Sequence, residues 1–274
     1  MPDASQHSIL RFDHVTVKFD GDLALEDLSF EAFEGESRVI LGAAGSGKTV
    51  LLKTALGLVK PDSGKVYAFD RDLTSMRERD LFEIRSKIGM LFQESALFDS
   101  LNIEENVAYP LLNQKSIRCP VDQVHPRVVQ ALEFVELADT LEKFPSELSG
   151  GMRRRAAIAR AVVTDPPLVL YDSPTAGLDP ITAHTIMALL IKERDMSHTT
   201  TLVVTHRYQD GNLIANFRYN SEKGGLEPAR NGARPGVRTT FMVLKEGRLV
   251  FEGDQNRLEA STDAYISKFV KHRE

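Results

Sequence analysis

Apolar and polar residues alternate at 9–19 and 25–33 of the 274-residue chain, which predicts two strands joined by a turn at Gly21-Asp22. Short apolar runs at 38–41, 88–92, 168–172 and 201–206 predict buried strands. Further strands are expected at 65–69, 240–244 and 248–251. With helices between the strands, this pattern predicts the α/β class.

Helical patterns lie between these strands, at 50–56, from about 78 to 87, and at 181–194. Three more lie together at about 103–109, 121–136 and 151–163, where Pro110 and Pro145 are expected to interrupt the helices. We therefore divide the chain into an α/β core, 1–93 and 165–274, and an inserted helical subdomain, 94–164.

One stretch fits the phosphate-loop template G-x-x-x-x-G-K-[ST] at every fixed position, between a predicted strand and a predicted helix. Its backbone N–H groups and the start of the helix would surround phosphate oxygens. Lys48 would reach the β- and γ-phosphates, and the Thr49 hydroxyl would bind Mg²⁺. The expected nucleotide-binding residues are Gly42, Ala43, Ala44, Gly45, Ser46, Gly47, Lys48, Thr49 and Val50.

Polar side chains stand at the ends of three predicted strands: Gln93, Asp172 and His206. Sites in open α/β sheets usually form at such strand ends. In phosphate-loop enzymes a carboxylate placed like Asp172 holds Mg²⁺, usually through water. Phe19, just before the first turn, is a candidate for stacking on a nucleotide base, and core packing explains it equally well.

A second anion site is expected where the helix at 151–163 begins, in the sequence Leu148-Ser149-Gly150-Gly151-Met152. Ser149 is a good N-cap, and the two glycines leave backbone N–H groups exposed. An ordinary capped helix start also accounts for this stretch. The basic run that follows, 153–155, is expected to be a solvated face with no catalytic role.

Composition narrows the class of protein. The net charge of −5 argues against a nucleic-acid binder, which is usually basic. Cys119 is the only cysteine, which indicates a reducing compartment without disulfides. The first residues lack the order of a signal peptide, and no apolar run reaches the roughly 18 residues of a membrane span. We therefore expect a cytoplasmic location.

Six features occur in the order and at roughly the spacing of an ABC-transporter ATPase. They are the phosphate loop, Gln93, the stretch 148–151, Asp172, the turn 176–179 and His206. The chain resembles that family over nearly its whole length. The resemblance implies a phosphate-loop (RecA-like) core with an antiparallel β subdomain and an inserted α-helical subdomain. It also implies ATP and Mg²⁺ as cofactors.

The same resemblance implies a homodimer with shared ATP sites, in which the phosphate loop of one chain faces Ser149, Gly150 and Gly151 of the other. Gln93 would sense the metal and the attacking water, and His206 would contact the γ-phosphate. The remaining nucleotide contacts that it implies are Phe19 and Asp179.

A finer resemblance lies in 90–98, 106–111 and 145–152, which are similar to the ATPase subunits of Mla-type (Mce-associated) phospholipid transporters. It implies an integral-membrane permease as partner, lipid as cargo, a lipid-binding Mce-type protein as a further partner, and a peripheral place on the inner face of the cell membrane. A groove for a permease helix is expected from Leu97, Phe98, Leu101 and Tyr109.

Two stretches depart from the family pattern. Ser173 stands where the family has a Glu that activates the attacking water, so we expect slow hydrolysis, with Lys48, Gln93 and His206 as the other catalytic candidates. His206 is the only obvious local substitute for the missing base. The basic, Gly/Pro-rich insertion at 218–238 is longer than the family usually allows, and we expect a mobile surface loop there.

Two alternative functions stay open at this point. Ser173 favours a non-hydrolysing, ATP-gated regulatory clamp. A soluble ABC protein of DNA repair, cofactor assembly or translation is the other alternative. The single cassette and the lack of a long coiled-coil pattern count against translation and repair roles.

Overall fold

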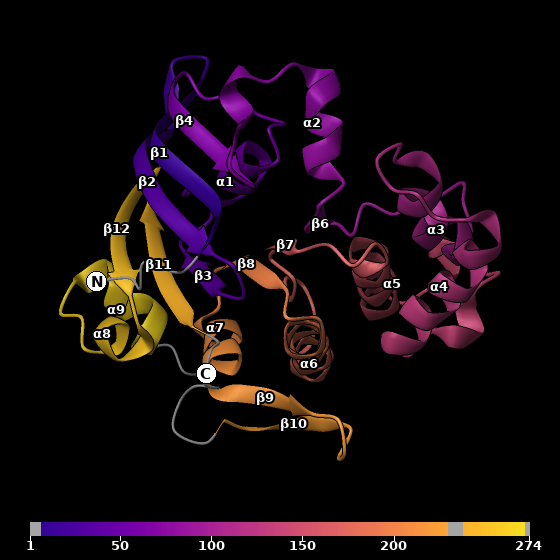
Figure 1. The fold of residues 1–274 in the computed structure, drawn as a ribbon. Helices are drawn as coiled ribbons and strands as arrows, with labels where there is room; N and C mark the ends of the chain where they lie inside the picture. The colour runs from indigo at the N-terminus through magenta and orange to yellow at the C-terminus, as the bar shows by residue number, and fades with distance from the viewer. Residues whose placement is uncertain (1–6, 230–237, 272–274) are drawn as a thin grey trace.

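The computed structural model describes residues 7–229 and 238–271. Its centre is a six-stranded sheet with the strand order β12-β11-β3-β8-β7-β6 (Figure 1). Neighbours from β11 to β6 are parallel, and β12 is antiparallel to β11. The strands are β3 (Ser37–Leu41), β6 (Ile88–Leu91), β7 (Leu168–Asp172), β8 (Thr200–Thr205), β11 (Thr239–Lys245) and β12 (Arg248–Gly253).

Each face of this sheet has its own apolar core. Val39 and Leu41 of β3 belong to one core, and Ile40 between them belongs to the other. Both faces are therefore covered, which explains why β3, β7 and β8 are buried along their whole length and contain continuous apolar runs.

The first core includes helices α3 (Ile103–Asn113), α4 (Val121–Phe134), α5 (Gly150–Val162), α6 (Pro180–Ser197), α7 (Tyr208–Asn216), α8 (Gln255–Glu259) and α9 (Ala264–Lys271). The second core includes helices α1 (Lys48–Ala55) and α2 (Glu78–Arg85) and a second, antiparallel sheet. That sheet has the order β2-β1-β4-β5 and consists of β1 (Ser8–Phe19), β2 (Asp22–Phe33), β4 (Ser63–Ala68) and β5 (Arg71–Asp72). The predicted fold class is confirmed.

Two expectations about the helices are wrong. Pro110 does not interrupt α3 but lies inside it, because Ile103, Val107 and Leu111 bury one face of the helix and this burial outweighs the missing backbone hydrogen bond. The sequence pattern also missed α7, α8 and α9. Two of these helices have fewer than nine residues, too short for a periodic pattern to stand out.

The insertion at 218–238 begins as a β-hairpin, so the predicted surface loop is wrong for this part. Strands β9 (Phe217–Asn220) and β10 (Gly225–Pro228) pair antiparallel, and the Tyr219 N–H donates to the Asp195 carboxylate of α6 at 2.8 Å. Hydrogen bonds from Asn220, Arg218 and Lys223 lower the pKa of Glu227 to about 2. Residues 230–237 lie outside the described part of the chain.

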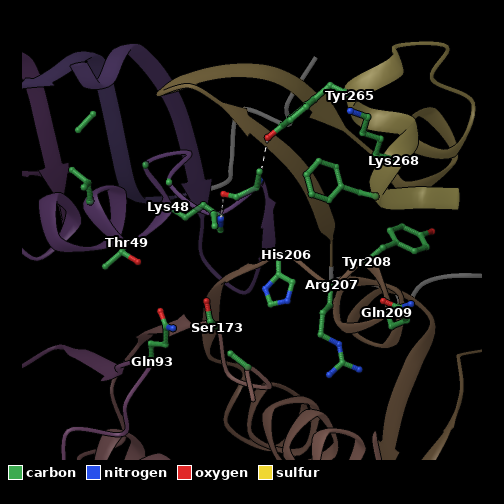
Figure 2. A pocket seen from close by; sticks show the side chains of 18 of the residues that line it. Lys48, Thr49, Gln93, Ser173, His206, Arg207, Tyr208, Gln209, Tyr265 and Lys268 are labelled. Carbon is green, nitrogen blue, oxygen red and sulfur yellow. Dashed lines mark hydrogen bonds between the residues drawn. The ribbon is translucent and has the colours of Figure 1, made fainter. Parts of the chain in front are cut away.

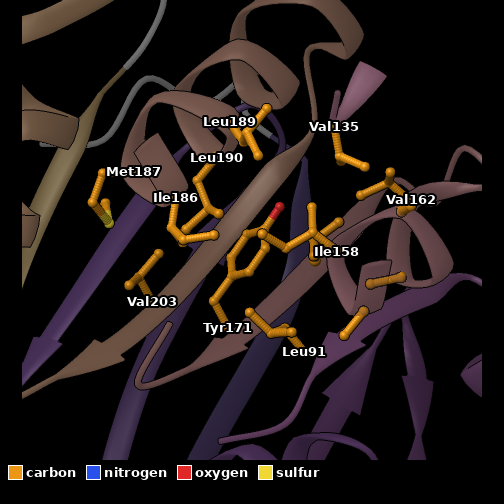
Figure 3. Packing of buried hydrophobic residues seen from close by; sticks show 14 of the residues in the cluster. Leu91, Val135, Ile158, Val162, Tyr171, Ile186, Met187, Leu189, Leu190 and Val203 are labelled. Atoms are coloured by element: carbon orange, nitrogen blue, oxygen red, sulfur yellow. The ribbon is translucent and has the colours of Figure 1, made fainter. Parts of the chain in front are cut away.

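Tyr171 of β7 is the largest fully buried side chain that the structure describes. Its ring lies among Ile158 of α5 and Ile186 and Leu190 of α6 (Figure 3). Among the described residues, its hydroxyl has no hydrogen-bond partner. A buried hydroxyl without a partner destabilises the folded state.

Replacing Tyr171 by Phe should therefore raise the free energy of unfolding, by about 1 kcal/mol, because the desolvation cost of the hydroxyl disappears. Urea titration measures the change. Tyr208→Phe is the matched control, since the Tyr208 hydroxyl bonds to Glu259 and accepts from Gln255 Nε2 at 2.7 Å, so this variant should lose stability. Equal destabilisation by both variants would contradict the account of Tyr171.

Candidate functional site

The segments that follow the parallel strands meet in one cavity of about 1160 Å³ (Figure 2). The loop after β3 forms one wall, and Gln93, Ser173 and His206 follow β6, β7 and β8 on the others. Parallel strands end at the same edge of a sheet, so residues far apart in sequence meet there. The structure therefore brings the predicted strand-end residues Gln93 and His206 to the phosphate loop. The third, Asp172, does not line the cavity but reaches the loop by accepting a hydrogen bond from Thr49.

Glycine is required at two positions of this loop. A Cβ on Gly42 would lie 2.7 Å from the carbonyl oxygen of Leu244, and a Cβ on Gly47 would lie 2.4 Å from the carbonyl oxygen of Ala24. Gly47 also has a φ of +98°, in the left-handed region that favours glycine. Helix α1 begins directly afterwards, and the N–H groups of its first turn have no partner within the helix. The result is an anion site at a helix start.

Lys48 lies inside this loop with 9% of its surface exposed. Its Nζ donates to the carbonyl oxygens of Gly42 and Ala43, at 2.8 Å each. Burial lowers the pKa of Lys48, and the nearby Asp172 carboxylate opposes this shift. A cation held next to unpaired N–H groups suits a ligand with several negative charges.

Thr49, at the start of α1, and Asp172, at the end of β7, are in contact next to the phosphate loop. The Thr49 hydroxyl donates to one Asp172 oxygen at 2.8 Å, and the Ser173 hydroxyl donates to the other at 3.1 Å. Gln93 faces the same space (Figure 2). Hydroxyl, carboxylate and amide oxygens fit Mg²⁺. The described residues contain no group of three or more His, Cys, Asp or Glu side chains that could hold a metal ion on its own.

His206 is exposed at the end of β8. Buried polar groups connect the neighbouring helix α7 to the end of β8 and to the loop after β7. The hydroxyls of Thr175 and Thr205 both donate to the Asp210 carboxylate at 2.7 Å. Burial raises the pKa of Asp210, against the effect of these hydrogen bonds. The loop after β7 is thereby tied to the loop after β8.

Helix α9 supplies a wall that the sequence did not predict, with Tyr265, Lys268 and Phe269. The Tyr265 hydroxyl, which points toward the phosphate loop (Figure 2), accepts from the N–H of Ala43 at 3.0 Å. It also donates to the carbonyl of Leu244 at 3.0 Å. Tyr265 and Ala43 are 222 positions apart, and α9 carries no motif, so no local signal connects them.

Several predicted site residues do not line this cavity. Phe19, the last residue of β1, is 48% exposed and outside the cavity lining, so base stacking by Phe19 stays a prediction. Ser149 caps α5 by accepting the Met152 N–H at 3.2 Å, which confirms the cap, and the second anion site stays a prediction. The cavity lining also lacks Gly150, Gly151 and Asp179. Asp179 instead caps α6.

One expectation for the basic run at 153–155 is wrong. Arg153 is exposed as predicted, but Arg154 has only 6% of its surface exposed. The reason is that Arg154 points from α5 toward the carbonyl groups of the segment after β6.

A glycine-rich loop between a buried strand and a helix, with a buried lysine and a Thr–Asp pair beneath it, defines a phosphate-loop nucleotide-binding protein. The model of the ABC transporter family matches residues 25–176, and the chain belongs to this family. The predicted class of ABC ATPase is thereby confirmed. Among the described residues, no helix is both long and apolar enough to cross a membrane.

Two relatives are intermembrane phospholipid transport system ATP-binding proteins named MlaF. The Haemophilus influenzae protein is 30% identical over 96% of this chain and 90% of its own length. The Escherichia coli K12 protein is 31% identical over 89% of this chain and 82% of its own length. A solved dimeric ATP-binding cassette, MJ0796 bound to ADP and Pi, has a TM-score of 0.74 and 30% identity, and the match covers 90% of this chain and 98% of that one.

Replacing Lys48 by Met should lower the affinity for ATP at least about tenfold, because charge-assisted hydrogen bonds to phosphate are lost. Titration with a fluorescent ATP analogue measures this change. Lys53→Met is the matched control, because Lys53 lies on the same helix and is exposed. Equal affinities of the two variants would contradict the role of Lys48.

Proposed function

We propose that this chain is the ATP-binding subunit of a phospholipid transporter, which dimerises with a second copy on Mg-ATP and drives a separate integral-membrane permease. The kinship to two phospholipid-transport ATP-binding proteins supports the cargo, since it extends over 96% and 89% of the chain. On this proposal the protein is peripheral on the inner face of the cell membrane. A lipid-binding Mce-type protein is a further proposed partner of the complex, and no nucleic-acid partner is expected.

The observation that carries the dimer is the separation of two half-sites. The phosphate loop, Gln93, Ser173 and His206 line one cavity, whereas Ser149 and the start of α5 are not among its lining residues. Residues 94–164, the proposed helical signature subdomain, would present Ser149, Gly150 and Gly151 to the nucleotide of the other copy. Residues 1–93 and 165–274, the proposed core, would hold that nucleotide. The dimeric state of MJ0796 supports this arrangement.

The chemistry in each site follows from the groups present. Backbone N–H groups at the start of α1 and the Lys48 ammonium hold phosphate oxygens. Thr49, Asp172 and Gln93 would hold Mg²⁺, which supplies neutralising charge when bound. Position 173 offers only a hydroxyl, already donated to Asp172 at 3.1 Å. Among the described residues that line the cavity, His206 is therefore the proposed water-activating group.

Ser173→Glu should raise the rate of ATP hydrolysis at least about tenfold, because a positioned general base contributes about 10²- to 10⁴-fold. Phosphate release by the complex with its permease measures the rate. Ser173→Gln is the control, since it has the size of Glu without a basic carboxylate. Equal rates for all three proteins would contradict a missing base at position 173.

The wild-type rate separates the transporter from the non-hydrolysing clamp. A wild-type complex that hydrolyses ATP and loses this activity on His206→Ala supports His206 as the water-activating group. A wild type that binds ATP without turnover, and without gain from Ser173→Glu, supports the clamp.

A shallow groove beside the segment after β6 is the proposed permease contact. Phe98 and Tyr109 line a cavity of about 390 Å³, their ring centroids lie 4.7 Å apart, and they are 42% and 40% exposed. Leu97, in contrast, packs against the first core. Two exposed aromatic rings in contact, tilted by 42° to each other, suit an apolar side chain of a partner helix.

Phe98→Asp should abolish co-purification of the permease while ATP affinity stays within about twofold, because a carboxylate in the groove must be desolvated on docking. Phe82→Asp is the control, an exposed aromatic of α2 outside the groove. Retention of the permease by Phe98→Asp would exclude this groove as the contact.

A further inference from the structure

Arg154 connects three segments of the site through one guanidinium group. It lies on α5, five positions after Ser149. Its Nη1 donates to the carbonyl oxygen of Phe92 at 3.1 Å and also to that of Gln93. Its Nη2 donates to the carbonyl oxygen of Ala176 at 3.4 Å, in the loop between Ser173 and Asp179.

Burying the charged side chain of Arg154 costs desolvation free energy. Arg154 is 6% exposed, and its Nε has no hydrogen-bond partner among the described residues. Burial lowers the pKa of Arg154, while Glu94 and Asp172 oppose this shift. A well-packed apolar residue often stabilises the folded state as much as a buried charge or more. Stability alone therefore does not explain a buried arginine at this position.

A second arginine of α5 holds the same segment. Arg160 donates to the carbonyl oxygens of Ser95 and Ala96 at 2.9 and 2.8 Å. Ser95 and Ala96 both have left-handed backbone conformations, with φ values of +63° and +50°. Such conformations cost free energy in non-glycine residues and persist where surrounding contacts impose them. Four carbonyl groups of the segment 92–96, those of Phe92, Gln93, Ser95 and Ala96, thus accept hydrogen bonds from arginines of α5.

We propose that Arg154 is a positioning residue that links Gln93 and the loop 173–179 of one ATP site to the start of α5, the half-site offered to the other copy. This inference rests on the shared sites of the proposed function. A shift of the Gln93 backbone must move or break the Arg154 contacts. Because Ser149 caps the same helix, such a shift also changes where Ser149 stands relative to a second copy.

Arg155 provides a matched control on the same helix. Its Nη1 also donates to two backbone carbonyls, those of Val135 and Glu136, at 3.1 and 3.2 Å. These acceptors follow α4 and lie outside the ATP cavity. A purely structural role of Arg154 predicts the same effects for Arg154→Met and Arg155→Met.

The test compares the full-length wild type, Arg154→Met, Arg154→Lys and Arg155→Met. ATP affinity, ATP-induced dimerisation and amide hydrogen exchange are measured for each. Arg154→Met should keep ATP affinity within about twofold and weaken ATP-induced dimerisation about tenfold, since the hydrogen bonds from a charged donor to the carbonyls of Phe92, Gln93 and Ala176 are all lost. Its amide exchange should rise at both 92–96 and 173–179. Arg155→Met should dimerise like wild type and keep wild-type exchange in both segments.

Arg154→Lys keeps the positive charge but lacks the guanidinium group, whose Nη1 and Nη2 donate to different segments. ATP-induced dimerisation of this variant should therefore stay well below that of wild type. The lysine variant also decides the test if the methionine variant fails to fold. Wild-type dimerisation and exchange in either Arg154 variant would overturn the proposal, as would effects equal to those of Arg155→Met. If wild type itself does not dimerise with ATP, the proposed function fails, and the paired exchange response of 92–96 and 173–179 still decides whether Arg154 links them.

Discussion

The close turn between β3 and α1 is the constraint on which the site depends. Gly47 lies so near the Ala24 carbonyl that no side chain fits, and Lys48 bonds to carbonyl groups of its own loop. This geometry places the N-terminus of α1 and the buried Lys48 side chain at the cavity. The parallel sheet then sets Gln93, Asp172 and His206 around that point, because β6, β7 and β8 end at the same edge.

The parts of the site that sequence predicted are those with local signals. The phosphate loop has a fixed spacing, and the strands at 168–172 and 201–206 each contain a continuous apolar run because both faces of β7 and β8 are buried. The position of Asp172 at a strand end was therefore enough to predict that it lies close to the phosphate loop. The hydrogen bond from Thr49 to Asp172 shows this proximity.

The parts that sequence missed depend on contacts between distant segments. Arg154 looks like a member of a solvated basic run, and only the packing of α5 against 92–93 and Ala176 buries it. Tyr265 reaches the Ala43 N–H from a helix at the other end of the chain. The hairpin at 217–228 has a loop-like composition, but polar bonds around Glu227 and the contact of Tyr219 with Asp195 order it.

In the proposed dimer, two copies share each ATP site. Mixing a Lys48→Met chain with a Ser149→Arg chain tests it directly, with ATP-induced association followed by energy transfer between labelled chains. Each variant alone would form only defective sites, whereas a mixed pair would combine an intact phosphate loop with an intact α5 start in one site. The account predicts association in the mixture and none in either variant alone. No gain on mixing, or full association of either variant alone, would contradict it.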